Sequence, residues 1–480
     1  MRRPRPTLRA RLALLPAALL IALWIPGASQ GAYRVDTGLY AAIGLHAWRE
    51  GPLWPLFAGD TPYFNKPPLP FLIHGLFLHL LGTDLWVARL PSLLAAIAAL
   101  FVTHQIVRLI SGPRTALITA GILALTLEFF RYTKAISLDL WLTLFLLIAA
   151  WSVARAIRNP PSITPPRRRA AHILLAGLPI GLALLVKPLV ALLAIPIFAL
   201  WIARHPRTTP RSPATHRGLA PDIAALAGAS VIAVAIASLW YIPMYVRFGD
   251  SFIEQHFTKQ AIERATGESF GADPWWYYLR LIAEKYWPWL IAVAATGYLL
   301  LRRRLDRAQR GAAFITFTWT LAWLAALSIF AGKSGRYAVP LYPFLAWLAA
   351  ISITCHAPRW LALLRRGAVR WLAPIALLAS LCISALGVRI HAPATPHWQA
   401  LYKFVRAHDH TDLWAAPGMA PTCANIYLAT GLWPRTATDS NTPPPGAILL
   451  YRDEIDARPP LHTPELWRSG PLFAVTTSTP

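Results

Sequence analysis

The sequence predicts an all-α polytopic membrane protein of about eleven transmembrane helices, of the length that a bilayer requires, with a small α/β domain at its C-terminal end. Of its 480 residues, 56% are hydrophobic and only 14% are charged, which is far more apolar than a soluble protein of this length would be. Apolar runs of spanning length recur along most of the chain, and short clusters of arginine separate them. A chain with this pattern is expected to cross a membrane many times.

The net charge of +25 does not indicate a nucleic-acid partner. The basic residues are grouped between apolar runs, which is typical of a polytopic protein that orients itself by positive loops.

The three cysteines, Cys355, Cys382 and Cys423, lie far apart along the chain. They therefore predict neither a disulfide framework nor a CxxC metal site.

The first apolar run, residues 11–26, follows several arginines and is either a signal peptide or a first spanning helix. GAS at 27–29 would serve as a cleavage site, but we favour an uncleaved helix because the rest of the chain is also embedded in the membrane. Ten further spans are predicted near residues 87–107, 115–133, 138–155, 170–187, 188–203, 222–246, 281–301, 311–331, 337–355 and 370–389.

The run Leu69 to Leu81 is shorter and is bracketed by KPP and Gly82, so it predicts a helix lying at the membrane interface. Two aromatic groups, WWYYL at 275–279 and YWPW at 286–289, are interpreted as an interface belt rather than a sugar platform.

Alternating the spans puts every large arginine cluster on one side of the membrane, which by the positive-inside rule is the cytoplasm, together with the N-terminus. An odd number of spans then leaves the C-terminal residues in the periplasm. We expect two domains: a transmembrane domain at 1–389, whose first outer loop is 27–86, and a periplasmic domain at 390–480. HWQALYKFVRAH at 397–408 predicts a helix in the second domain, and AILLY at 447–451 predicts a strand.

Two carboxylates are candidate catalytic groups on the outer face. Asp36 opens a segment with helical spacing directly after the first span, and Asp139 lies at the outer mouth of another span. A helix N-cap is the simpler interpretation of either residue. We favour catalysis for Asp36, because the same outer loop also carries Lys66 in a turn flanked by prolines.

Several cations also lie where an apolar run meets the outer surface. Lys66, Lys187, Lys333 and Arg336 have this position. Snorkelling explains any one of them, but several cations beside carboxylates favour a site for a lipid phosphate.

Six motifs, taken in their order, resemble the polytopic glycosyltransferases of the GT-C type, in the branch that contains bacterial aminoarabinose transferases and protein O-mannosyltransferase-like proteins. They are DTGLYA from Asp36, YFNKPPLPFLI with Lys66, RLPS at 89–92, SLDLWLTLFLLIA with Asp139, LLVKP with Lys187, and GKSGRYAVPLYPFLA from Gly332. The resemblance covers most of the chain. It implies an enzyme of the inner membrane that moves one sugar from a polyprenyl phosphate to an envelope acceptor, a lipid A, glycan or protein, on the periplasmic side.

On this resemblance Asp36 matches the family's essential loop acid and is the expected catalytic base, and Asp139 orients the acceptor or steadies the oxocarbenium ion. Lys66, Lys333, Arg336 and Tyr337 are expected to bind the donor phosphate. Thr37 stands where the family commonly has Glu, and Asn65 stands where the aminoarabinose transferases tend to have Glu. The Asn65 departure bears on any divalent metal at this loop, so no cofactor is assigned and a divalent metal is left open.

Two other functions stay open from the residues alone. A flippase or transporter of polyprenyl-linked sugars would also need outer cations, but it would require polar residues at mid-membrane depth, which the apolar runs largely lack. A structural partner in an envelope complex would give Asp36 and Lys66 no purpose.

Overall fold

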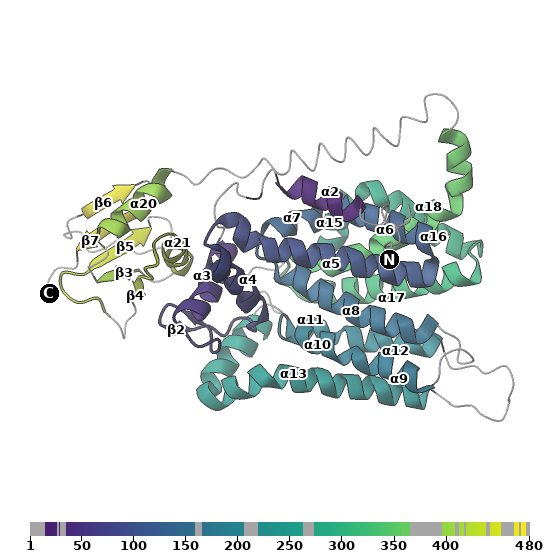
Figure 1. Cartoon of the computed structure of the whole chain (residues 1–480), viewed down its shortest axis with the longest axis horizontal. Helices are drawn as coiled ribbons and strands as arrows, with labels where there is room; N and C mark the ends of the chain where they lie inside the picture. Colours follow the sequence, from purple (N-terminus) through teal and green to yellow (C-terminus); the bar gives the residue numbers. More distant parts are fainter. Residues whose placement is uncertain are drawn as a thin grey trace, which may run out of the picture. The chain divides into compact units, whose positions relative to one another are not determined.

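The computed structural model describes residues 15–25, 28, 35–158, 166–205, 219–262, 273–364, 396–408, 412–416, 419–437, 442–452, 465–469 and 472–476 (Figure 1). Its contacts form two compact units. Unit 1 comprises residues 1–25, 65–67 and 92–387, and unit 2 comprises residues 26–64, 68–91 and 388–480. The predicted domain boundary between residues 389 and 390 stays a prediction.

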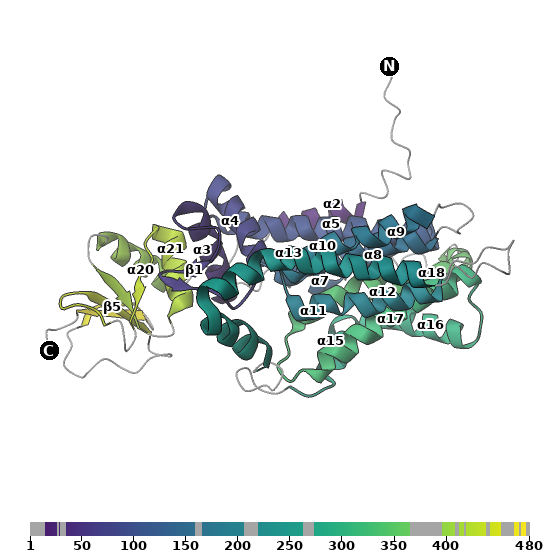
Figure 2. The same ribbon diagram turned by 90° about the horizontal axis from the view of Figure 1, so that it is seen from below.

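Unit 1 is a bundle of helices in which α8 packs against α10 and α10 packs against α13 (Figures 1 and 2). Its elements are α2 (Leu15–Trp24), most of α5 (Leu85–Ser111), α6 (Pro113–Ala124), α7 (Leu127–Arg131), η2 (Tyr132–Lys134), α8 (Leu138–Arg158), α9 (Pro166–Leu175), α10 (Gly177–Leu184), α11 (Pro188–Leu192), α12 (Ala194–Arg204), α13 (Ala220–Ile253), η3 (Glu254–Ile262), α15 (Tyr277–Lys285), α16 (Trp287–Leu301), α17 (Arg307–Ile329), η4 (Gly335–Leu341) and α18 (Tyr342–Leu364).

The chain is a multi-pass membrane protein, but fewer helices than the eleven expected are long enough to cross a bilayer. Among the described residues, five helical stretches are sufficiently long and apolar: Leu85–Ser111, Leu138–Arg158, Ala220–Lys259, Arg307–Ile329 and Gly335–His356. A sixth is counted if α6 and the helix after it, which are bent by 59°, form one span. The expected span at 370–389 lies outside the described residues.

Breaks in the backbone account for the other differences. The expected spans at 170–187 and 188–203 are four helices, α9 to α12, and the expected span at 281–301 is divided between α15 and α16. The break before α11 has a local cause. Pro188 is the first residue of α11, and helical backbone is disfavoured for the residue before a proline. In agreement with this, Lys187 is extended with φ −149° and ψ 97°.

Aromatic side chains and a buried ion pair occupy part of the interior of unit 1. Trp319 stacks on Trp323 with ring centroids 5.5 Å apart and planes 9° apart, and on Phe344 at 4.4 Å. Arg169 on α9 donates from Nε to Asp222 on α13 at 3.0 Å, and both side chains are almost fully buried. Removing one member of such a pair leaves a buried charge uncompensated, so this contact fixes how α9 and α13 pack.

Unit 2 contains a small mixed sheet, as the sequence predicts. Its elements are α3 (Val35–Arg49), β1 (Phe57–Ala58), β2 (Thr61–Pro62), α4 (Leu69–Leu81), the start of α5, α20 (Pro396–Ala407), β3 (Leu413–Ala415), α21 (Ala420–Thr430), β4 (Arg435–Thr436), β5 (Ile448–Arg452), β6 (Glu465–Ser469) and β7 (Leu472–Thr476). The helix expected at 397–408 is α20, and the strand expected at 447–451 is β5, so both expectations are confirmed.

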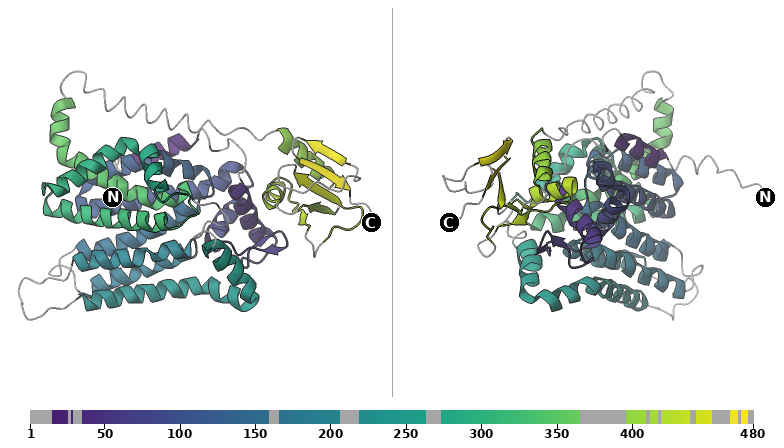
Figure 3. Two further views of the ribbon diagram at one scale, coloured as in Figure 1. Left: turned by 180° about the vertical axis from the view of Figure 1, so that it is seen from behind. Right: turned by 60° about the vertical axis from the view of Figure 1, so that its left-hand side comes forward.

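The five strands follow the order β4-β3-β5-β7-β6. Strand β3 is parallel to β4 and β5, whereas β7 is antiparallel to β5 and β6. Helices α20 and α21 share one hydrophobic core with the sheet and cover the same face of it (Figure 3). Val405 of α20, Cys423 and Ile426 of α21 and Leu450 of β5 lie in this core.

Helices α3 and α4 of unit 2 meet backbone to backbone. A Cβ atom at Gly44 would lie 2.3 Å from the carbonyl oxygen of Phe71, and a Cβ atom at Gly75 would lie 2.1 Å from the carbonyl oxygen of Gly44. The indole of Trp48 also donates to the carbonyl of Leu72 at 2.8 Å. Glycine at both positions is therefore what allows the two helices to approach so closely. Helix α4 has the bounds that the sequence predicts, Leu69–Leu81.

Candidate functional site

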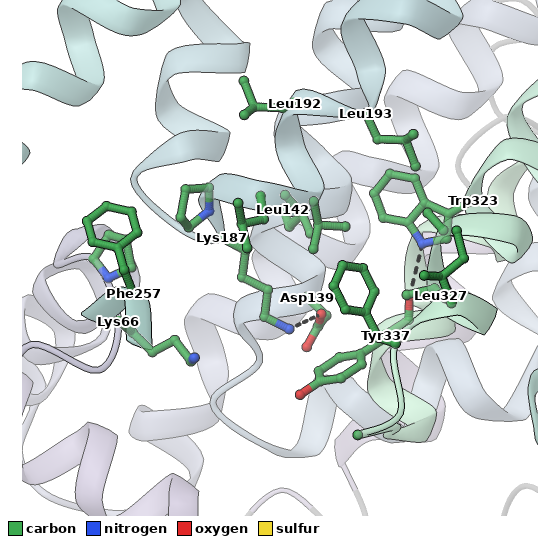
Figure 4. A pocket seen from close by; sticks show the side chains of 18 of the residues that line it. Lys66, Asp139, Leu142, Lys187, Leu192, Leu193, Phe257, Trp323, Leu327 and Tyr337 are labelled. Carbon is green, nitrogen blue, oxygen red and sulfur yellow. Dashed lines mark hydrogen bonds and ion pairs between the residues drawn. The ribbon is translucent and has the colours of Figure 1, made fainter. Parts of the chain in front are cut away.

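A pocket of about 550 Å³ lies within unit 1, and its wall is mainly apolar (Figure 4). Leucines of α8 and α11, Leu193 directly after α11, and aromatic and aliphatic side chains of α17 make up most of the wall. The lining residues are Asn65, Lys66, Pro67, Asp139, Leu142, Lys187, Pro188, Leu189, Val190, Leu192, Leu193, His256, Phe257, Tyr278, Trp323, Ala326, Leu327, Ile329, Phe330, Gly332 and Tyr337. A pocket of this composition suits an apolar chain that ends in a charged group.

An ion pair between Asp139 and Lys187 provides the pocket with charge. Asp139 is the second residue of α8, and Lys187 occupies the extended position directly before α11. The ammonium nitrogen lies 2.5 Å from Oδ1 of the carboxylate, and the two side chains are only 12% and 3% exposed. The same nitrogen lies 4.3 Å from the ring centroid of Tyr337. The break at Pro188 is therefore what turns Lys187 toward both partners.

Lys66 brings a second ammonium group to the pocket. Together with Asn65 and Pro67 it forms the short segment of the first outer loop that belongs to unit 1. Its side chain extends into the pocket in the direction of Lys187 and Asp139 (Figure 4). The sequence placed Lys66 and Asp139 in one site, and the structure shows both in one pocket wall.

The loop after α17 supplies the remaining predicted residues. Tyr337 lines the pocket, and its backbone carbonyl accepts a hydrogen bond from the indole of Trp323 at 3.1 Å. The guanidinium carbon of Arg336 lies 5.8 Å from the Tyr337 ring centroid, so this cation is next to the lining but does not belong to it.

Lys333 has local partners instead. Its ammonium donates to the carbonyl of Ser328 at 3.2 Å and to that of Phe330, at the C-terminal end of α17. A cation at the last carbonyls of a helix stabilises that end. Desolvation lowers the pKa of the Lys333 ammonium from its ordinary value. In this conformation the Lys333 ammonium caps α17, and Gly332 directly before it lines the pocket.

Asp36 belongs to unit 2, where it lies in the first turn of α3. It follows Val35, the first residue of the helix, so it occupies a position inside the helix rather than the N-cap position before it. A carboxylate in the first turn interacts favourably with the N-terminal end of the helix dipole. The side chain is partly exposed, as a group that exchanges protons must be.

Two polar residues that line the pocket, Lys187 and Tyr278, are given no role in the site by the resemblance. Lys187 was one of four candidate cations, and the Lys-Pro pair that places it is visible in LLVKP. Tyr278 was assigned to an interface belt, yet its ring is 1% exposed, and its hydroxyl donates to the carbonyl of Ser334 at 3.2 Å. Trp275 and Trp276 beside it are exposed, as a belt requires. No periodicity in the sequence distinguishes the buried Tyr278 from its exposed neighbours Trp275 and Trp276.

Metal ligands do not gather in the part of the chain that the structure describes: no group of three or more His, Cys, Asp or Glu side chains there could hold an ion.

Comparison with known proteins identifies chains that are similar in sequence and solved structures that are similar in fold. Residues 65–241 match the family model described as dolichyl-phosphate-mannose-protein mannosyltransferase. The undecaprenyl phosphate-alpha-4-amino-4-deoxy-L-arabinose arabinosyl transferase 1 of Pseudomonas fluorescens (strain Pf0-1) is 27% identical over 330 residues, which are 66% of this chain and 53% of that protein. The corresponding transferase of Pectobacterium atrosepticum is 26% identical over 71% of this chain and 55% of its own length. The chain thus spans about half the length of these curated relatives.

Solved structures share the fold over nearly the whole chain. The crystal structure of ArnT from Cupriavidus metallidurans bound to undecaprenyl phosphate superposes with a TM-score of 0.73 at 17% identity, covering 96% of this chain and 97% of that one. The archaeal oligosaccharyltransferase AglB from Archaeoglobus fulgidus superposes with a TM-score of 0.59 at 12% identity, covering 91% and 65%.

Proposed function

We propose that this chain, a polytopic membrane protein of the GT-C type, is a glycosyltransferase that moves a single sugar from a polyprenyl phosphate to an acceptor of the cell envelope. The observation that carries the proposal is the unit 1 pocket, in which Lys66 and the Asp139–Lys187 pair lie at an otherwise apolar wall. An apolar wall suits an isoprenoid chain, and the ammonium groups suit its phosphate. The functions of the relatives and the undecaprenyl phosphate bound in the Cupriavidus structure support this donor class.

The proposed reaction breaks the bond between the anomeric carbon and the phosphate oxygen. The electron pair of that bond leaves with the phosphate, and the acceptor oxygen bonds to the anomeric carbon and loses its proton. Positive charge therefore develops on the sugar and negative charge on the leaving phosphate. The reaction needs a base for the acceptor and cations for the phosphate, and both kinds of residue are present.

We assign the role of the base to Asp36 and the stabilisation of the leaving phosphate to Lys66. Arg336, Lys333 and Tyr337 are assigned as further residues that bind the phosphate of the sugar donor. Asp139 steadies the oxocarbenium ion or orients the acceptor. Lys187 pairs with Asp139, and its ammonium group lies in the same pocket wall as Lys66, where it would contact the phosphate of the sugar donor.

A reconstituted assay tests the proposal. The purified chain is placed in proteoliposomes that contain an undecaprenyl-phosphate-linked sugar, and lipid A, glycan and protein acceptors are supplied in separate reactions. Mass spectrometry should detect free undecaprenyl phosphate together with one sugar added to one acceptor class. A donor that changes leaflet and stays intact would support the flippase alternative and would contradict the transferase.

We also propose that the N-terminus faces the cytoplasm and that transfer takes place on the periplasmic side of the inner membrane. The one-sided arginine clusters between the apolar runs support this orientation. Alkaline phosphatase fused after Pro480 should be active, and the same fusion in the loop with Arg167 should be inactive. The reverse result would place the catalytic residues on the wrong side for a periplasmic acceptor.

A further inference from the structure

Within unit 2, the last turn of α3 is bound to the C-terminal helix α21 through Glu50. The hydroxyl of Tyr427 donates to Oε1 of Glu50 at 2.6 Å, and Nδ1 of His46 lies 3.2 Å from Oε2 of the same carboxylate. One oxygen of Glu50 thus accepts a hydrogen bond from α21, and the other lies close to the imidazole of His46 on α3. Glu50 and Tyr427 are 377 residues apart in the sequence, so this contact joins the first outer loop to the C-terminal domain.

Aromatic packing surrounds this hydrogen bond. The ring of Tyr427 lies 5.8 Å from the ring of His46 and 5.1 Å from that of Trp433. Trp433 also covers the turn between β1 and β2. Gly59 in that turn has φ +65°, and a Cβ atom there would lie 2.7 Å from the indole. The C-terminal domain therefore contacts the first outer loop at two places, the end of α3 and the β1–β2 turn.

The opposite side of α21 is fixed to the sheet. Met419, Cys423 and Ile426 lie in the hydrophobic core that α20 and the strands share. Tyr427 follows directly after Ile426 and is 1% exposed. One short helix therefore packs on the sheet through one face and holds α3 through the other.

Helix α3 is a rigid connection between this contact and Asp36. Fourteen residues separate Asp36 from Glu50, which is about 20 Å at the rise of an α-helix. The helix is also clamped to α4 through Gly44 and Gly75, where no side chain separates the backbones. A helix held at its C-terminal end and along its length transmits its orientation to its first turn.

The pKa of the Tyr427 hydroxyl agrees with its role as the donor of this hydrogen bond. Burial and the neighbouring Glu50 raise the pKa of the Tyr427 hydroxyl, while Arg49 acts in the opposite direction. A raised pKa keeps the phenol protonated at neutral pH, so that it continues to donate to the carboxylate. A hydrogen bond to a charged acceptor is among the stronger ones in proteins.

We propose that the C-terminal domain is a positioning element for α3, and that Tyr427 acts through Glu50 to hold Asp36 at the angle that transfer requires. The inference rests on the proposed function, because it gives the domain a role in the same reaction. Tyr427 and Glu50 are positioning residues and do not touch the substrate. The proposal predicts that loosening α21 from α3 slows the chemical step and leaves donor binding intact.

The Tyr427→Phe variant tests this, because it keeps the ring and removes only the donor. We expect hydrogen exchange of residues 35–49 to become about tenfold faster, and kcat to fall by a similar factor, with KM for the donor unchanged. Exchange in β5 should stay as in the parent. Tyr402→Phe on α20 is the matched control, and it should leave both quantities unchanged.

Two Glu50 variants approach the contact from the other side. Glu50→Gln retains an oxygen that accepts from Tyr427 and should keep most of the parent kcat, whereas Glu50→Ala should resemble Tyr427→Phe. Combining Glu50→Ala with Tyr427→Phe should add little further loss, since both remove the same contact.

Two results would overturn the inference. One is unchanged exchange of α3 in both Tyr427→Phe and Glu50→Ala, and the other is faster exchange with parental kcat. A parent chain that transfers no sugar would refute the proposed function instead, and the exchange measurement would still decide whether α21 restrains α3.

Discussion

The ammonium nitrogen of Lys187 lies 2.5 Å from Oδ1 of Asp139, although 48 residues separate the two along the chain. Both side chains are nearly buried in the pocket wall, so each charge depends on the other for its compensation. Removing one member of a buried ion pair costs about 3–5 kcal/mol, whereas replacing both by neutral groups is often tolerated.

Lys187→Met should therefore lower the stability of the protein by about this amount. The combination of Asp139→Asn with Lys187→Met should recover most of the stability, but it should not transfer sugar, because Asp139→Asn removes the carboxylate. Thermal unfolding in detergent measures the stability of each variant, and the transfer assay measures its activity. Arg280→Met is the control, since it breaks an exposed pair with Glu284 at 3.7 Å, and such pairs contribute about 1 kcal/mol or less. Equal stability of Lys187→Met and the parent would mean that the pair does not form.

Asp36→Asn should give a stable and inactive protein. The amide has nearly the same volume as the carboxylate but accepts no proton, and loss of a general base slows reactions by about 10² to 10⁴ fold. The change at the first turn of α3 should alter stability by no more than about 1 kcal/mol. The rate of transfer by purified protein checks this, with Asp60→Asn in the β1–β2 turn as the control. Transfer within a few fold of the parent would exclude Asp36 as the base and would make Asp139 the next candidate.

Lys66→Ala should weaken use of the donor. A charge-assisted hydrogen bond to a phosphate contributes about 1.5–3 kcal/mol, which corresponds to a rise in KM for the donor of about tenfold or more. Lys66→Arg should retain part of the affinity, because it keeps the charge. Initial rates at varied concentrations of polyprenyl-phosphate sugar give the result, and Lys403→Ala on the exposed side of α20 serves as the control. An alanine variant with parental KM and kcat would remove Lys66 from the donor site.

Acid should destabilise unit 2 through His74. Its side chain is fully buried, and its Nδ1 lies 2.7 Å from the carbonyl oxygen of Ala88. Desolvation lowers the pKa of His74 from 6.5 to about 4. The unfolded chain therefore binds a proton near pH 6.5 and the folded chain only near pH 4, so stability falls as the pH decreases through this window and no further below it. A shift of this size corresponds to about 3 kcal/mol.

His74→Gln should reduce the loss of stability between pH 7 and pH 4, as measured by thermal unfolding in detergent. His79→Gln removes an exposed imidazole from the same helix and should leave the loss as it is in the parent. If both variants follow the parental profile, His74 does not control the response to acid.

The elements that could be predicted from sequence are those whose ends are marked locally. Helix α4 was predicted with its observed bounds because KPP precedes it and Gly82 ends it. The runs at 170–203 and 281–301 were predicted as uninterrupted spans because hydropathy measures composition and not the course of the backbone. Proline at the first turns of α11 and α16 marks those starts, and the sequence contains both signals.

The residues of the candidate site likewise differ in whether they could be predicted from sequence. Lys66 and Asp139 could be predicted because each is a charge at the end of an apolar run, where only a few functions explain it. The partnership of Asp139 with Lys187 and that of Glu50 with Tyr427 could not, because contacts across 48 and 377 residues arise from the packing of whole helices. No local sequence pattern predicts these two contacts.

The interruption between α10 and α11 also determines how the backbone groups at these helix ends are hydrogen-bonded. Helix α10 ends at Leu184 and α11 begins at Pro188, inside a long apolar run. The terminal carbonyl groups of a helix need donors that the helix itself does not supply, and hydrocarbon tails cannot provide them. At this break the amides of Val186 and Lys187 donate to the carbonyl oxygen of Ala183 in α10. The chain can therefore leave the helix within an apolar run while its own amides satisfy this carbonyl, and Lys187 and Pro188 reach the pocket wall.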